Sequence, residues 1–190
     1  MVNHAPFLFF DTETGGVDPE RHSLLSIGMV VGRGREVIAQ TEIFIRHDPY
    51  VVTAGGLEVN RIDLVSHHKR AMEPMAAWEA MRTFLVPHFP PEEKIILVGH
   101  NISFDRAFLD AFLKSVEQDP GSRISHRSID THAIAAMLKD AGRIPSSVAL
   151  NSSGLFDHFQ INVPSADRHT ALGDALGTYK LYWCMVDCAS

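Results

Sequence analysis

Four acidic residues and one histidine are the side chains of this sequence best suited to chemistry. They lie far apart along the chain, at Asp11, Glu13, Asp105, His169 and Asp174. Carboxylates that gather without basic partners repel one another, so divalent cations are the natural compensation if the fold brings these four together. Such cations activate water and stabilise developing charge on phosphoryl oxygens. The pattern therefore predicts metal-assisted chemistry on a phosphate group.

The first pair, Asp11 and Glu13, follows an apolar run. Side chains two residues apart on a strand lie on the same face, so both carboxylates would project together from the end of a buried strand and could hold one cation. A polar turn leading to Gly15 and Gly16 would explain the same residues. The triplet alone does not decide between these interpretations.

Asp105 belongs to a second segment, GHNISFD, which follows the apolar run 95–98. Ligand sites in open α/β sheets lie beyond the carboxyl ends of strands, and this segment and Asp11 both lie at such ends. Alternatively, Asn101 or Ser103 caps the next helix and Asp105 complements the helix dipole. The two interpretations are compatible.

His169 and Asp174 form the third element, at the start of the last predicted helix. A single histidine is usually a surface or packing residue, and an aspartate on a helix is often solvated. Asp174, however, lies within the apolar helical stretch 171–176, where a carboxylate is costly unless it meets a ligand or a donor. This favours a functional role for Asp174.

Short apolar runs and amphipathic stretches predict the elements that must position these residues. Strands are expected at 7–10, 23–31, 37–45, 95–98 and 126–130, and helices at 74–87, 103–112, 131–141 and 172–186. Glycines at 32 and 34 predict a hairpin, so the first three strands should form an antiparallel meander. A loop rich in Gly55, Gly56 and Asn60 is expected after them. The fold class is therefore α/β, a mixed five-stranded sheet flanked by helices.

The 190 residues, 45% of them hydrophobic, predict a single domain over residues 1–190. The apolar runs are shorter than the ~20 residues of a membrane helix, and the N-terminal residues do not resemble an export signal. A cytoplasmic protein without a membrane partner is expected, with Cys184 and Cys188 as packing residues or free thiols. The formal charge of −6 argues against coating long nucleic acid but allows the gripping of a strand end.

Taken together and in order, three segments resemble the DEDDh family of 3′–5′ exonucleases, which includes the DNA polymerase III epsilon subunit and ribonuclease T. They read FFDTETGG, VGHNISFDRAFL and RHTALGDALGTYKLY, and the resemblance covers about residues 7 to 183. Asp130-Thr131 also resembles an Asp-Thr pair that these enzymes carry before a helix, where the acid is expected to be a cap.

The resemblance implies a ribonuclease H-like fold and a site for two Mg²⁺ or Mn²⁺ ions. Asp11, Glu13 and Asp174 would bind one ion, with Asp11 bridging to the second and Asp105 assisting through water. His169 would be the general base that deprotonates the attacking water. The implied product is a nucleoside 5′-monophosphate.

The implied substrate is the 3′ end of single-stranded DNA or RNA, with DNA favoured. Residues expected to hold it are Thr12, Glu13, Asn60, Asn101 and Phe104, although Phe104 also suits a core position. Asn60 and Arg61 stand where many relatives have a histidine that touches the terminal nucleotide. Trimming of RNA ends stays an alternative, as does a catalytically silent module, against which the five filled site positions argue. A stand-alone enzyme is expected, with a DNA polymerase or a second copy of the chain as possible partners.

Overall fold

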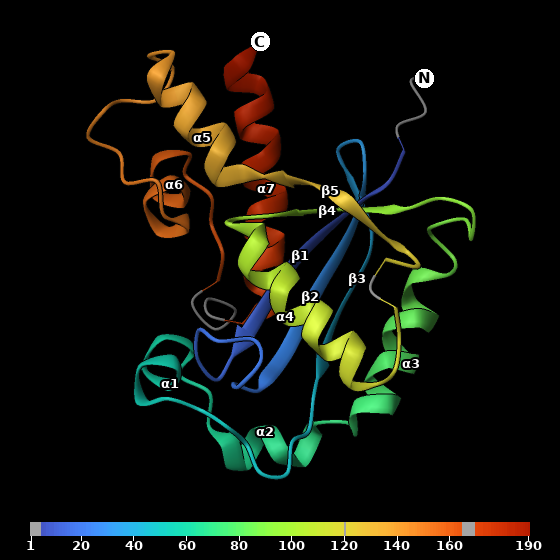
Figure 1. Ribbon diagram of the computed structural model, residues 1–190. Coiled ribbons are helices and arrows are strands. Elements are labelled where there is room, and N and C mark those ends of the chain that lie inside the picture. The colour runs from blue at the N-terminus through green and yellow to red at the C-terminus, as the bar shows by residue number, and fades with distance from the viewer. Residues whose placement is uncertain (1–4, 120, 165–169) are drawn as a thin grey trace.

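The computed structural model describes residues 5–119, 121–164 and 170–190, and its strands form one mixed sheet in the order β3-β2-β1-β4-β5 (Figure 1). The strands are β1 (Phe7–Thr14), β2 (Leu24–Arg33), β3 (Glu36–Phe44), β4 (Ile95–Gly99) and β5 (Ile124–Asp130). β1 pairs antiparallel with β2 and β2 with β3, whereas β1 with β4 and β4 with β5 are parallel. The predicted meander followed by strand–helix units is confirmed.

The central strand β1 is buried on both of its faces. Leu8 and Phe10 belong to a core cluster on one side of the sheet, and Phe9 belongs to a second cluster on the other side. Successive side chains of a strand point to opposite faces, so a strand between two packed layers needs apolar residues at every position. This explains the unbroken apolar run at the start of the sequence.

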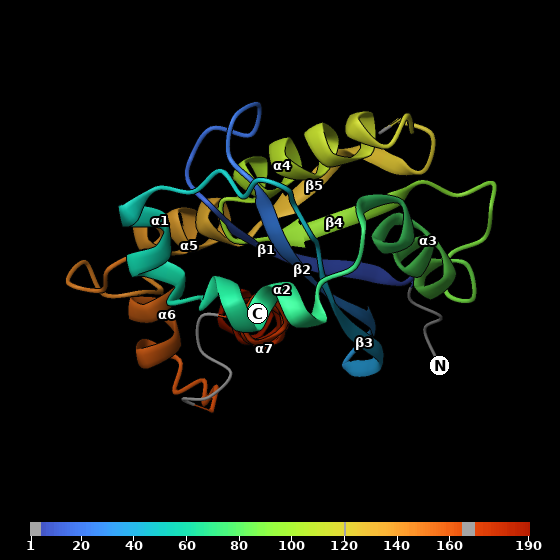
Figure 2. The ribbon, with the colours of Figure 1, turned by 90° about the horizontal axis from the view of Figure 1, so that it is seen from below.

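Helices cover both faces of the sheet (Figure 2). The first core cluster includes residues of α3 (Pro74–Leu85) and α4 (Ile102–Ser115), and the second includes residues of α7 (Ala171–Ala189). A third cluster joins α7 to α5 (Thr131–Asp140) and α6 (Ser152–His158). Among the described residues, no helix combines the length and the apolar character needed to cross a membrane.

The segment expected as a glycine-rich loop instead contains two short helices, α1 (Ala54–Asn60) and α2 (Leu64–Arg70). The side chains of Thr53 and Asp63 cap them by accepting hydrogen bonds from backbone N–H groups of their first turns. Helices of two turns are too short to show an amphipathic period, and Gly55 and Gly56 disfavour helix in isolation. Tertiary contacts and caps decide the structure here.

Helix α7 is held against the sheet near both of its ends. At its start it lies on Gly28 of β2, where a Cβ atom would stand 2.1 Å from the carbonyl carbon of Ala171 and 2.4 Å from the nitrogen of Leu172. Near its C-terminus, Arg35 pairs with Asp187 and lies 4.9 Å from the ring centroid of Trp183. The position of this helix along the sheet is therefore defined by close contacts.

Replacing Gly28 with alanine should lower the free energy of unfolding by about 1–3 kcal/mol, because the added methyl group would overlap the backbone of α7. Urea denaturation followed by circular dichroism measures this change. Gly55→Ala is the matched control, since nothing lies within 4 Å of a Cβ built at that helical position. Equal stability of wild type and Gly28→Ala would contradict the packing described above.

Candidate metal centre

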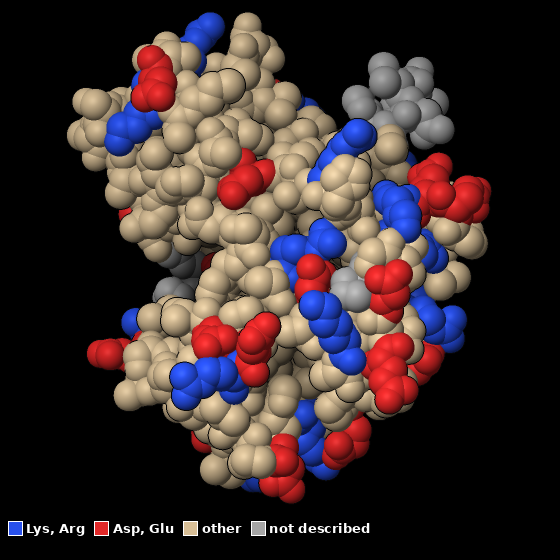
Figure 3. All heavy atoms as spheres, in the orientation of Figure 1, with Lys and Arg blue, Asp and Glu red and all other residues tan. Residues whose placement is uncertain are grey.

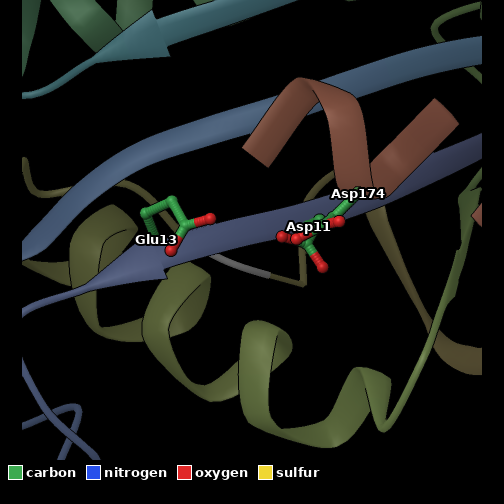
Figure 4. A group of neighbouring side chains, drawn as sticks. All are labelled: Asp11, Glu13 and Asp174. Atoms are coloured by element: carbon green, nitrogen blue, oxygen red, sulfur yellow. The ribbon is translucent and has the colours of Figure 1, made fainter. Parts of the chain in front are cut away.

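Three of the predicted carboxylates meet in one group at the C-terminal part of β1. One carboxylate oxygen from each of Asp11, Glu13 and Asp174 lies within 4.8 Å of the other two. Figure 4 shows Asp11 and Glu13 on the same strand and Asp174 approaching them from the first turn of α7. This spacing suits oxygen atoms that surround a single hard cation. The structure thus brings together residues more than 150 positions apart.

The electrostatics of this group favour a cation. Burial raises the pKa of the Glu13 carboxyl to about 9, and the charges of Asp174, Glu42 and Asp105 act in the same direction. Burial also raises the pKa of Asp11 well above its ordinary value, reinforced by Asp105 and Asp174. Without a positive charge, the ionised form of the cluster is strongly disfavoured, and a bound divalent ion would reverse this effect.

Asp105 approaches β1 from the α4 side of the sheet and contacts Thr12. Its side chain is only 4% exposed, and its Oδ1 accepts hydrogen bonds from Thr12 N at 2.9 Å and Thr12 Oγ1 at 2.7 Å. Burial raises the pKa of Asp105 to about 7, although both bonds from Thr12 oppose the shift. Among the described residues, Asp105 lies outside the three-carboxylate group. Its water-mediated role stays a prediction.

Asn101 is the residue before α4, and its backbone is hydrogen-bonded to the cap of α5. Its backbone has a left-handed φ of 58°, and its side chain makes no capping bond. Its N–H donates to Oδ1 of Asp130 at 3.0 Å, and the same oxygen accepts a bond from the N–H of His132 at 2.9 Å. The prediction that Asp130 is a helix cap is therefore confirmed, whereas the capping role considered for Asn101 is not observed.

A pocket of about 320 Å³ opens beside Glu13. It is lined by residues of β1, the loop after it, α1 and α4: Thr12, Glu13, Thr14, Gly16, Val17, Thr53, Gly55, Gly56, Val59, Asn60 and Phe104. Four of the five predicted substrate-binding residues thus line it, and Asn101 does not. Val17 and Val59, which are 80% and 69% exposed, were not predicted. Isolated valines in loop-like sequence carry no recognisable signal.

Two residues that line the pocket, Asn60 and Phe104, also make contacts that stabilise the fold. Asn60 is buried, its Nδ2 donates to the carbonyl of Thr14 at 3.0 Å, and its Oδ1 accepts from Ile62 N at 3.1 Å. Its amide therefore fixes α1 against β1. Phe104 packs on Phe108 with ring centroids 5.1 Å apart, yet it stays 38% exposed toward the pocket. Substrate contacts by either residue stay predictions.

His169 lies outside the described residues, so its predicted role as general base also stays a prediction. The structure does describe Thr170, the residue that precedes α7. Its Oγ1 accepts a hydrogen bond from Gly173 N at 3.0 Å, which makes Thr170 the N-cap of the helix that carries Asp174.

One acid close to the cluster was missed by the sequence analysis. Glu42, on β3, is partly buried, and its charge raises the pKa of both Asp11 and Glu13. In the sequence it lies in a strand segment of mixed polar and apolar residues, a pattern typical of a solvent-exposed edge strand. Only the register of β3 on β2 reveals its position.

Comparison of the sequence with known proteins shows which families and proteins this chain is similar to. A family model described as an exonuclease matches residues 8–182. The DNA polymerase III subunit epsilon of Treponema pallidum (strain Nichols) is 29% identical over 185 residues, which cover 96% of this chain and 77% of that protein. The 3′–5′ DNA exonuclease Cap18 of Escherichia coli is 26% identical over 106 residues, 56% of each protein.

Among solved structures, E. coli exonuclease I in complex with a dT13 oligonucleotide has a similar fold. The TM-score is 0.77 at 16% sequence identity, and the match covers 94% of this chain but 40% of that one. This chain thus spans less than two thirds of exonuclease I and of Cap18. The fold likeness confirms the predicted ribonuclease H-like architecture.

The raised pKa values predict how stability depends on pH in the absence of metal. The folded state holds protons on Glu13 up to about pH 9, whereas the unfolded chain releases them near its ordinary pKa of 4.5. The free energy of unfolding in EDTA should therefore fall as the pH rises from 5 to 9, by up to about 1.4 kcal/mol per pH unit for each proton. Urea titrations at a series of pH values measure the slope.

Two controls separate the cluster from other titrating groups. Glu13→Gln is neutral at every pH and should flatten the decline, and Mg²⁺ added to the wild-type protein should flatten it as well. A wild-type stability in EDTA that is constant or rises over this range would contradict the electrostatics described for the site.

Proposed function

Since this chain belongs to the exonuclease family, we propose that it removes nucleoside 5′-monophosphates from the 3′ ends of single-stranded nucleic acid, with DNA preferred over RNA. The observation that carries the proposal is the group formed by Asp11, Glu13 and Asp174 beside an open pocket. All three ligand positions are filled by competent residues, which argues against a silent module.

The three carboxylates suit divalent cations because they supply only oxygen ligands and because burial and mutual repulsion disfavour their metal-free ionised form. When bound, two Mg²⁺ or Mn²⁺ ions would stabilise the attacking and leaving oxygens of an in-line displacement at phosphorus. Asp11, Glu13 and Asp174 would hold them, while Asp105 keeps the backbone of Thr12 in place. His169 would accept the proton of the attacking water.

The pocket beside Glu13 suits a strand end. Its volume of about 320 Å³ is at the small end for ligand sites, and its rim offers the exposed apolar side chains of Val17, Val59 and Phe104. Apolar and aromatic surfaces hold unpaired bases with little sequence preference. A terminal nucleotide placed there would present its phosphate to Glu13 and the neighbouring carboxylates.

The charge distribution supports action at ends rather than along a duplex. Figure 3 shows Lys and Arg side chains interspersed with Asp and Glu side chains on the face it displays, and the whole chain carries a formal charge of −6. Coating of long nucleic acid relies on neutralising many phosphates with basic groups. An enzyme with bound metal ions can instead attract the reacting phosphate locally.

We favour DNA because Cap18 is named a DNA exonuclease and the epsilon subunit belongs to a DNA polymerase. The epsilon relative also makes a DNA polymerase the protein partner to test, and a homodimer stays a prediction.

We further infer that residues 1–190 act as a single exonuclease domain. Cys184 and Cys188 are free thiols, and free thiols are typical of proteins in the reducing cytoplasm, which supports a cytoplasmic location.

The proposal is tested on single strands of DNA and RNA labelled at the 3′ end. With Mg²⁺ or Mn²⁺, the wild-type protein should release labelled nucleoside 5′-monophosphate as the first product, and faster from DNA than from RNA. Asp11→Asn and Asp174→Asn should reduce this release below detection, because each removes a charged ligand. Asp140→Asn, an exposed acid at the end of α5, is the matched control and should keep wild-type activity.

Full turnover in either Asp11→Asn or Asp174→Asn would rule out the proposed site. Faster release from RNA would instead establish the alternative of RNA 3′-end trimming at the same site.

His169→Ala should lower kcat by roughly 10²–10⁴, the usual contribution of a positioned general base. Because a general base does not ligate the cation, calorimetric Mn²⁺ affinity should stay at the wild-type value. Loss of Mn²⁺ binding in this variant would show that His169 has a different role.

A further inference from the structure

Three residues from neighbouring strands form a row beneath the start of α7. Asp11 of β1 is paired with Gly28 of β2, and Gly28 is paired with Glu42 of β3. Residues directly opposite one another in a sheet share a face, so Asp11 and Glu42 lie on either side of Gly28. The first turn of α7 occupies the space that a side chain at Gly28 would fill.

The same row places Glu42 beside the N–H groups at the start of this helix, because the backbone of Ala171 and Leu172 lies on Gly28, the residue paired with Glu42. Burial raises the pKa of the Glu42 carboxyl, and hydrogen bonding from the backbone of Ala171 and Leu172 acts in the opposite direction. The next N–H, that of Gly173, is taken by Thr170 Oγ1, and that of Asp174 by the Thr170 carbonyl at 3.0 Å. The first N–H groups of a helix have no partners within the helix, and a negative charge is favoured beside them.

The start of α7 is buried, so its backbone N–H groups need an acceptor from the protein. Ala171 is 0% exposed, so its N–H cannot turn to water if Glu42 is removed. Glu42 is itself oriented by Ser26, whose Oγ donates to Glu42 Oε1 at 3.1 Å. Ser26 is paired with Glu13 across the sheet. A short chain of contacts thus joins β1, β2, β3 and the start of α7.

Glu42 does not belong to the ligand group, which among the described residues comprises Asp11, Glu13 and Asp174. Its charge adds to the repulsion within that group rather than relieving it. A role in anchoring the helix accounts for an acid at this position, whereas direct ligation does not.

We propose that Glu42 is a positioning residue, which anchors the first turn of α7 over Gly28 and thereby fixes Asp174 relative to Asp11 and Glu13. The inference rests on the proposed function, because the Mn²⁺ affinity and the rate of strand hydrolysis are the measurements that report on the position of Asp174. Glu42 acts through the backbone of α7 and touches neither metal nor substrate.

The test compares Glu42→Ala, Glu42→Gln and the control Glu36→Ala, an exposed glutamate at the start of the same strand. For each variant, calorimetry gives the Mn²⁺ affinity, steady-state digestion of a DNA strand gives kcat and KM, and amide hydrogen exchange by NMR reports on Ala171 and Leu172. Thermal unfolding verifies that each variant is folded.

Glu42→Ala should speed amide exchange at Ala171 and Leu172, weaken Mn²⁺ binding and lower kcat by about 10- to 100-fold, the effect of misplacing a functional group by about 1 Å. KM for the strand should change less than kcat, because the pocket beside Glu13 is untouched. Glu42→Gln keeps a side-chain oxygen that can accept an N–H bond, so it should recover most of the loss. Glu36→Ala should match the wild type.

Wild-type kcat and Mn²⁺ affinity in Glu42→Ala would overturn the proposal, even if its unfolding temperature fell. Equal impairment of Glu42→Gln and Glu42→Ala would also overturn it, since charge rather than hydrogen bonding would then be responsible. If the wild-type protein released no nucleotide, the proposed function would fail instead. The amide exchange at Ala171 and Leu172 would in that case still decide whether Glu42 anchors the helix.

Discussion

Repulsion among carboxylates held at short range is the constraint on which this structure depends. Asp11, Glu13 and Asp174 keep oxygen atoms within 4.8 Å of one another in a partly buried setting that opposes their ionisation. Flexible elements would separate under that repulsion, so the carboxylates must be carried by rigid ones. The central strand meets this need because both of its faces are packed. Helix α7 meets it because close contacts hold it near both ends.

The alternation of β1 divides the site between two layers. Asp11 and Glu13 point toward α7, whereas Thr12 between them meets Asp105 of α4 on the opposite face. The N–H of Thr12 is available because the described pairing between β1 and β4 ends at Phe9, so the two strands have diverged by this point. The divergence lets the start of α4 approach the strand. One strand therefore presents two carboxylates on one face and is anchored through Thr12 on the other.

Local patterns in the sequence were sufficient for the strands, the long helices and the placement of two acids together on β1. The unbroken apolar run of β1 indicated a central strand, and the spacing of Asp11 and Glu13 placed both carboxylates on one face. Asp130 was correctly interpreted as a cap because an acid before a helix has a local mechanism. These features depend on neighbours in the chain and on strand periodicity.

What the sequence did not reveal depends on long-range packing. Helices α1 and α2 are short and are stabilised by caps and by contacts such as Asn60 with Thr14. Glu42 resembles a surface acid until the register of three strands places it beside Gly28 and the end of α7. A strand register and a helix docking point involve residues far apart in sequence, and composition or periodicity does not encode them directly.

Anomalous X-ray scattering from crystals soaked with Mn²⁺ and a nucleoside 5′-monophosphate would locate the bound ions. We expect two manganese peaks about 3.5–4 Å apart, one of them coordinated by Asp11, Glu13 and Asp174, with the phosphate between the ions and the pocket beside Glu13. Manganese bound elsewhere, with no peak at coordinating distance from Asp11, would contradict a metal centre at these carboxylates.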